Sequence, residues 1–170
     1  MVENDMRQAV VHWLEAQGME VFHECVVTHG ICDIVGVRFA PRTGRRIPPL
    51  VWSVAVELKL ARIGEVIAQA RGNMYGVCAS FAAMPADRCR RMTRNSTLAF
   101  VGAGIGLLSV DVAAGTVKSC ISPVAVNDGR EQQHAPRWWR WHKRNEKKQA
   151  ATDCGTPTQE QRNEQPWRTN

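Results

Sequence analysis

Hydrophobic residues recur along the first part of the chain at spacings that change from helical to strand-like. Between residues 3 and 17 apolar side chains return every three or four positions, which predicts an amphipathic helix, and Gly18 follows as its C-terminal cap. β-Branched residues then become frequent in residues 19–27 and 30–39, on either side of a Thr-His-Gly turn. These two segments are predicted to be paired strands.

The next hydrophobic segments alternate between strand and helix patterns. After a loop rich in Pro and Gly at residues 40–49, residues 50–60 are almost continuously apolar and predict a strand in the interior of a sheet. A helical stripe with a polar opposite side follows over residues 63–77, and residues 78–84 predict a further strand. The remaining predictions are a short basic helix at residues 86–94 and closing strands at residues 97–101 and 106–112. The order α-β-β-β-α-β predicts an α/β fold with a mixed central sheet flanked by helices.

The apolar periodicity stops at Val126, which predicts a globular domain over residues 1–126 and a polar tail over residues 127–170. The tail contains the segment RWWRWHKRNEKK at residues 137–148, with six basic side chains, one acidic one and a net charge of +5. Indole rings stack on bases while Arg and Lys bind phosphates, so this mixture favours nucleic acid as a partner. The candidate nucleic-acid-binding residues are Arg137, Trp138, Trp139, Arg140, Trp141, Lys143 and Arg144.

A structural explanation of the same segment stays open. A C-terminal helix that packs its Trp face on the domain and exposes its charges to water would have the same composition. Residues 151–170 contain almost no aliphatic side chains and are predicted to be disordered.

The composition of the chain indicates the cellular compartment and the class of partner to expect. The chain has 170 residues, 44% of them hydrophobic, which is enough for a core that needs no disulfide bonds. None of its six cysteines belongs to a C-x-x-C pair, and no apolar run approaches the roughly 18 residues of a membrane span. We therefore expect a cytoplasmic protein with reduced thiols and no membrane partner. The net charge of +6 favours polyanionic partners.

Three charged residues interrupt apolar strand segments, where an unpaired buried charge would be costly. Glu57 and Lys59 stand two positions apart in VAVELKL, and Asp33 stands in ICDIV. Residues two apart on a strand share a face, so Glu57 and Lys59 are predicted to lie side by side. A hairpin centred on Arg45 would place Asp33 directly opposite Glu57, with their Cβ atoms about 5 Å apart.

This cluster suits hydrolysis of a phosphodiester assisted by a metal ion. Two carboxylates can bind one Mg²⁺ ion, which would polarise a phosphoryl oxygen and lower the pKa of a bound water. Lys59 would orient that water or neutralise developing charge, and Gln69 on the polar side of the second predicted helix would position the water or a phosphate. A salt bridge from Lys59 to Asp33 or Glu57 in an ordinary sheet is the alternative that the residues leave open.

At these residues the chain resembles the PD-(D/E)XK nuclease superfamily, whose restriction-endonuclease-like fold occurs in Holliday-junction resolvases, many restriction enzymes and transposon-end nucleases. The resemblance spans about residues 3–112 and consists of a first helix, GICDIVG, VELK, a helix carrying Gln69 and a strand leading to AAMP. Cys32 stands where the name of the motif has proline, at a position that varies widely within the superfamily.

The resemblance implies a divalent-metal nuclease and assigns roles to individual residues. Asp33, Glu57 and the backbone carbonyl of Leu58 would bind Mg²⁺, for which Mn²⁺ would substitute. The implied catalytic residues are Asp33, Glu57, Lys59, Gln69 and, on the first helix, Glu3.

The leading hypothesis is therefore a DNA endonuclease that depends on Mg²⁺ and hydrolyses phosphodiester bonds. Its expected partners are DNA and a second copy of the chain or a larger nucleoprotein complex. One alternative is a non-catalytic nucleic-acid-binding module that uses the same fold as a scaffold. Another is a junction resolvase or transposase nuclease subunit that acts with a partner.

Overall fold

The computed structural model of the chain describes residues 3–27, 30–41, 47–126, 129–141 and 143–144. The predicted disordered end, and parts of the turn at residues 28–30 and of the loop at residues 40–49, lie outside the described residues. The chain divides into two units, Met1–Pro136 and Arg137–Asn170, whereas the hydrophobic pattern predicts the boundary after Val126. Among the described residues, no helix has the length and apolar character that crossing a membrane requires.

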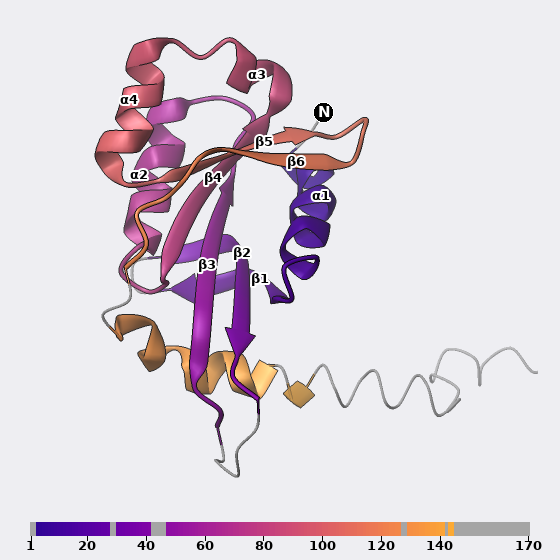
Figure 1. The fold of residues 1–170 in the computed structure, drawn as a ribbon, viewed down its shortest axis with the longest axis vertical. Coiled ribbons are helices and arrows are strands. Elements are labelled where there is room, and N and C mark those ends of the chain that lie inside the picture. Colours follow the sequence, from indigo (N-terminus) through magenta and orange to yellow (C-terminus); the bar gives the residue numbers. More distant parts are fainter. Residues whose placement is uncertain (1–2, 28–29, 42–46, 127–128, 142, 145–170) are drawn as a thin grey trace, which may run out of the picture. The chain divides into compact units, whose positions relative to one another are not determined.

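Within the described part of the first unit, six strands form one open sheet (Figure 1). The strands are β1 (Glu20–Val27), β2 (Gly30–Phe39), β3 (Leu50–Leu58), β4 (Ala79–Pro85), β5 (Gly106–Asp111) and β6 (Thr116–Ile121). The helices are α1 (Glu3–Glu15), α2 (Ile63–Asn73), α3 (Ala86–Arg90), α4 (Arg94–Ala103) and the 3-10 helix η1 (Arg130–Gln133). The chain therefore begins in the predicted order, α1-β1-β2-β3-α2-β4.

The sheet is mixed, and its strands lie side by side in the order in which they follow along the chain. β1, β2 and β3 pair antiparallel, β3, β4 and β5 pair parallel, and β6 returns antiparallel to β5. Parallel pairing requires crossover connections, which α2 supplies between β3 and β4, and α3 with α4 between β4 and β5. β3 lies in the interior of the sheet, as its apolar run predicts, so the α/β class with a mixed sheet is confirmed.

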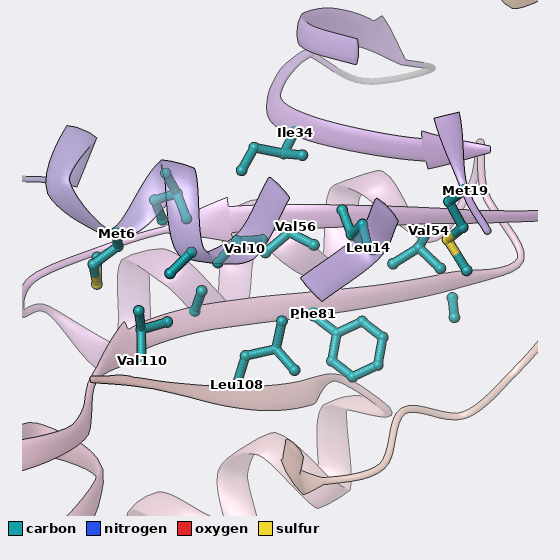
Figure 2. Packing of buried hydrophobic residues seen from close by; sticks show 14 residues of the cluster. Met6, Val10, Leu14, Met19, Ile34, Val54, Val56, Phe81, Leu108 and Val110 are labelled. Carbon is teal, nitrogen blue, oxygen red and sulfur yellow. The ribbon is translucent and has the colours of Figure 1, made fainter. Parts of the chain in front are cut away.

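Helices cover both faces of the sheet. α1 packs Met6, Val10 and Leu14 on one face, in the same cluster as Val56 of β3 and Leu108 of β5 (Figure 2). α2 and α4 pack on the opposite face, and alternate residues of β4 belong to the two clusters (Figure 1). The second cluster consists of Val66, Ala70, Ala82, Met84, Phe100, Ile105 and Leu107.

One glycine, Gly18, ends the helical turn that follows α1. Gly18 has a φ of 72°, in the left-handed region that glycine adopts without strain. Its N–H donates to the carbonyl of Glu15 at 2.8 Å, and the N–H of Met19 donates to the carbonyl of Leu14 at 3.2 Å. These bonds satisfy carbonyls of the last turn and turn the chain into β1, as the sequence predicts.

Residues 97–101 form part of α4, so their prediction as a strand is wrong. The segment TLAFV has local strand propensity, but the side chain of Thr93 caps the helix by accepting a hydrogen bond from the Ser96 N–H at 3.2 Å. Gly104, with a φ of 71°, ends the helix, and Phe100 anchors it in the core. The two caps and one buried aromatic ring outweigh the local propensity.

Candidate active site

The antiparallel pairing of β2 with β3 sets the geometry of the candidate site. Ile34 pairs with Val56 and Arg38 pairs with Trp52, which confirms the register predicted from a hairpin centred on Arg45. A register shift occurs between Arg38 and Phe39, on the loop side of these pairs, so it leaves the position of Asp33 unchanged. Continuation of the register beyond Ile34 brings Asp33 opposite Glu57, on one face of the sheet.

The carboxylate of Asp33 is held from two sides. Its Oδ2 accepts a hydrogen bond from the backbone N–H of Leu58 at 2.8 Å. Arg7 of α1 donates through Nη1 to the Asp33 carbonyl at 2.9 Å and places Nη2 3.8 Å from Asp33 Oδ1. The side chain of Asp33 keeps an exposed fraction of 29%, so it reaches solvent while its orientation is fixed.

Glu57 lies much deeper than Asp33, with only 4% of the residue exposed. Burial is the main cause that raises the pKa of Glu57 to about 7, and the charge of Asp33 and a hydrogen bond with the Asp33 carboxyl raise it further. Asn73 of α2 opposes this shift by donating Nδ2 to Glu57 Oε1 at 2.7 Å, and the charge of Lys59 opposes it weakly. The carboxyl groups of Asp33 and Glu57 therefore interact electrostatically on one face of the sheet.

Lys59 follows the last residue of β3 and reaches α1. Its backbone N–H donates to the carbonyl of Ala83 at 3.0 Å, and its Nζ lies 3.7 Å from Oε1 of Glu3. The two side chains belong to the wall of a pocket of about 230 Å³, which Leu60, Ala61, Arg62 and Glu65 complete. Among the ion pairs of the described residues, Lys59 pairs with Glu3 rather than with Asp33 or Glu57, the partners of the alternative salt bridge.

The second helix contributes a different residue from the predicted one. Gln69 is exposed, whereas Asn73, which the polar stripe also placed on the solvent side, is 4% exposed and bonds Glu57. Val66 and Ala70 precede Asn73 on the buried side at intervals of four and three residues, so the helical spacing itself signals that Asn73 turns inward.

Sequence reasoning also missed Arg7. Its guanidinium contacts Asp33 and lies 3.4 Å from Nδ1 of His23 in β1. Burial, followed by the charge of Arg7, lowers the pKa of His23, so the neutral ring accepts from the guanidinium. The available signal is the four-residue spacing between Glu3 and Arg7, which places both on one side of α1.

Two residues with left-handed backbone flank this cluster, and among the described residues they are the only non-glycine ones with a positive φ. Glu24 of β1 has a φ of 50° and lies opposite Asp33, at a position that the β1–β2 pairing skips. Arg62, with φ and ψ both 62°, precedes α2 in the wall of the pocket that contains Lys59. Such conformations cost of order 1–3 kcal/mol each and concentrate at functional sites.

The donor atoms fit a hard divalent cation that also binds substrate. Mg²⁺ is usually held by one or two carboxylates together with waters and substrate phosphates, and Asp33 and Glu57 offer two carboxylates within reach of each other. Burial is the main cause of the raised pKa of Glu57, and the charge of Asp33 adds to it; a cation between the two groups would remove that second contribution. No group of three or more His, Cys, Asp or Glu side chains able to hold a metal occurs in the described part of the chain.

The candidate nucleic-acid-binding residues of the second unit differ in exposure. Trp138 is fully buried, Trp139 and Trp141 are half-buried, and Arg140 and Arg144 are exposed. The remaining members are half-buried; they are Arg137 and Lys143. Lys143 places Nζ 5.0 Å from the centroid of the Trp139 ring, a cation–π contact.

Comparison of the chain with protein-family models, with curated proteins and with solved structures gave no match.

Proposed function

We propose that the chain is a divalent-metal-dependent DNA endonuclease of the PD-(D/E)XK type. The observation that carries the proposal is that Asp33 and Glu57 interact on one face of the sheet, with Lys59 two residues after Glu57 in the motif. Glu3, which the resemblance implies as a catalytic residue on the first helix, places Oε1 3.7 Å from Nζ of Lys59. Asp33 of β2, Glu57 of β3 and Lys59 directly after β3 are the three residues chosen from the sequence pattern, and Glu3 of α1 joins them through Lys59.

The arrangement of the elements supports a restriction-endonuclease-like core. The order α1-β1-β2-β3-α2-β4, with an antiparallel β2–β3 pair and a parallel β3–β4 pair, provides the αβββαβ core that the motif requires. α1 and α2 lie on opposite faces of this sheet and contribute Glu3 and Asn73 from the two sides (Figure 1).

Asp33, Glu57 and the backbone carbonyl of Leu58 would hold Mg²⁺ or Mn²⁺. When bound, such an ion polarises the phosphoryl oxygen and lowers the pKa of a water molecule. Arg7 and the N–H of Leu58 fix the orientation of Asp33, while Asn73 fixes that of Glu57.

Lys59 would supply a positive charge to the site. Its ammonium group would donate to the attacking water or to a phosphate oxygen in the transition state, where added negative charge develops. Lys59 and Glu3, which form an ion pair, both line the pocket of about 230 Å³. Gln69, exposed on α2, would contact DNA rather than the buried carboxylates.

The test is cleavage of linear, supercoiled, branched and single-stranded DNA with Mg²⁺ or Mn²⁺. We expect Asp33→Asn and Lys59→Met to reduce the rate by about 10²–10³-fold or more while circular dichroism shows an unchanged fold. Glu15→Gln, an exposed carboxylate on α1, is the matched control and should cut at the wild-type rate.

Cleavage that Asp33→Asn leaves intact would contradict the proposed site. Metal-independent DNA binding without cleavage of any substrate, unchanged by Asp33→Asn and abolished by removal of residues 127–170, would instead select the non-catalytic binding module.

A further inference from the structure

A second pocket, of about 470 Å³, lies away from the carboxylates, between α3 and the strands β5 and β6. Its volume falls within the range of about 300–1,000 Å³ that is usual for small-molecule sites. None of Asp33, Glu57 and Lys59 lines it, so it is a separate feature of the first unit.

Two exposed cations line this pocket. Arg90 ends α3 and Lys118 lies in β6, and both are exposed. The lining contains no Asp or Glu, and neither residue takes part in an ion pair among the residues that the structure describes. Asp87 of α3, whose charge acts on Cys89 in this lining, offsets part of this positive charge, and the remainder favours an anionic ligand such as a phosphate.

Three other side chains of the lining are apolar. They are Met92, Leu107 and Ile121, and Leu107, which is 3% exposed, belongs to the second core cluster. A bare inorganic anion would leave these side chains in contact with water. A ligand that joins a phosphate to a flat, weakly polar group would cover them and gain the corresponding hydrophobic stabilisation.

We propose that this pocket binds a phosphate ester of nucleotide size, with the phosphate between Arg90 and Lys118 and the base on Met92, Leu107 and Ile121. The Arg90 guanidinium suits two parallel hydrogen bonds to phosphate oxygens, and the Lys118 ammonium adds a point charge. The ligand is either a free nucleotide or the terminal nucleotide of a nucleic-acid strand.

Two thiols in the lining provide a measurement of occupancy. Cys120 is exposed, and Cys89 is half-buried with a pKa that burial raises, so Cys120 is the more reactive of the two. The other described cysteines, Cys25, Cys32 and Cys78, are buried. A ligand in the pocket should therefore slow the alkylation of Cys120.

The experiment uses the full chain in the presence of a chelator, so that the result does not depend on cleavage. Adenosine 5′-monophosphate, a 5′-phosphorylated oligonucleotide and adenosine are titrated while iodoacetamide labelling of Cys120 is measured by mass spectrometry. We expect saturable protection by at least one phosphorylated probe and none by adenosine. Lys118→Ala and Arg90→Ala should each weaken that protection about tenfold or more, whereas Arg38→Ala, an exposed arginine on β2, should not.

Equal protection by adenosine, or wild-type protection in both cation variants, would overturn the proposal. Protection by the mononucleotide identifies a free nucleotide as the ligand, and protection by the oligonucleotide alone identifies a strand terminus. If Arg90→Ala fails to fold, Lys118→Ala on the edge strand β6 still decides the outcome.

Discussion

Glu57 is a carboxyl group that the fold buries at the candidate site. Its pKa rises from 4.5 to about 7 because the folded protein removes it from water and places it against Asp33. Between these two pH values the unfolded chain has released a proton that the folded protein still holds. Rising pH therefore lowers the free energy of unfolding over this interval. Above the interval the full loss remains, because Glu57 is then ionised in both states.

We expect the metal-free protein to lose stability as pH rises from 4.5 to about 7, by about 3 kcal/mol for this group. Glu57→Gln should remove that part of the slope, because the amide does not ionise. The comparison is urea unfolding of both proteins at about pH 5 and about pH 8. If the free energy of unfolding changed equally with pH in the two proteins, ionisation of Glu57 would not be the cause of the loss of stability.

Asn73 should matter most when Glu57 is ionised. Asn73→Ala removes the amide that donates to Glu57 Oε1 at 2.7 Å and leaves a buried carboxylate without that donor. We expect a loss of about 1–3 kcal/mol above the pKa of Glu57 and a smaller loss below it. Gln69→Ala, on the exposed side of the same helix, should change stability by less than about 0.5 kcal/mol. Equal losses for the two variants would contradict the role of Asn73.

The position of Asp33 beside Glu57 was predictable, but the residues that hold them were less so. The hairpin length and the strand period together define which residues face each other, so spacing alone leads to the pair. Arg7 acts through a long, flexible side chain whose direction no local pattern defines. The helical spacing after Val66 and Ala70 places Asn73 on the buried side of α2. That spacing does not reveal its partner, because the buried carboxylate of Glu57 comes from a different element.

At the scale of elements, Gly106 of β5 leaves no room for a side chain beside β4. A Cβ added there would lie 2.3 Å from Cδ1 of Phe81, its pairing partner in β4. Phe81 is 7% exposed and packs edge-on against Trp13 of α1, with the ring centroids 5.9 Å apart, so it has little room to move.

Gly106→Ala should therefore destabilise the protein by about 1–3 kcal/mol through overpacking. Gly102 in α4 has no atom within 4 Å of an added Cβ, and Gly102→Ala should stabilise by about 0.5–1 kcal/mol through helix propensity. Thermal unfolding of the two variants checks both signs. A neutral Gly106→Ala variant would mean that the β4–β5 contact relaxes freely.

The elements that the sequence predicts well are those whose hydrophobic period extends over the whole element. α1, β3 and β4 are of this kind. The strand β6 carries no buried residue, so no alternating core pattern marks TVKSCI as a strand; its pairing with β5 defines it. The helix α4 has a single buried residue, so its sequence shows no helical repeat of apolar positions. Prediction from the sequence therefore follows the strand propensity of its residues, although the caps make the segment helical in the structure.

At the scale of the whole molecule, the basic segment at residues 137–148 and the described residues of the candidate site belong to different units of the chain. Within the second unit, buried Trp138 and exposed Arg140 and Arg144 are expected to have different roles. Trp138→Ala should lower stability by about 3–5 kcal/mol, as expected for a large buried aromatic side chain.

Neutralising the cations of this segment should weaken DNA binding without changing the chemistry. The variant replaces Arg137, Arg140, Lys143 and Arg144 with Gln in the full chain. For each phosphate that the variant no longer neutralises, the slope of log K against log salt should fall by about 0.9, since fewer counterions are released on binding. The measurement is DNA affinity over a range of salt concentrations, with Trp138→Phe as the control that keeps the charges.

The cleavage rate separates a role in binding from a role in the reaction. At saturating DNA the rate of the neutralised variant should match wild type, because Asp33, Glu57 and Lys59 are unchanged. An unchanged salt slope would assign the four cations to packing rather than to DNA. A reduced rate at saturation would place them in the active site, since saturation already compensates for weaker binding.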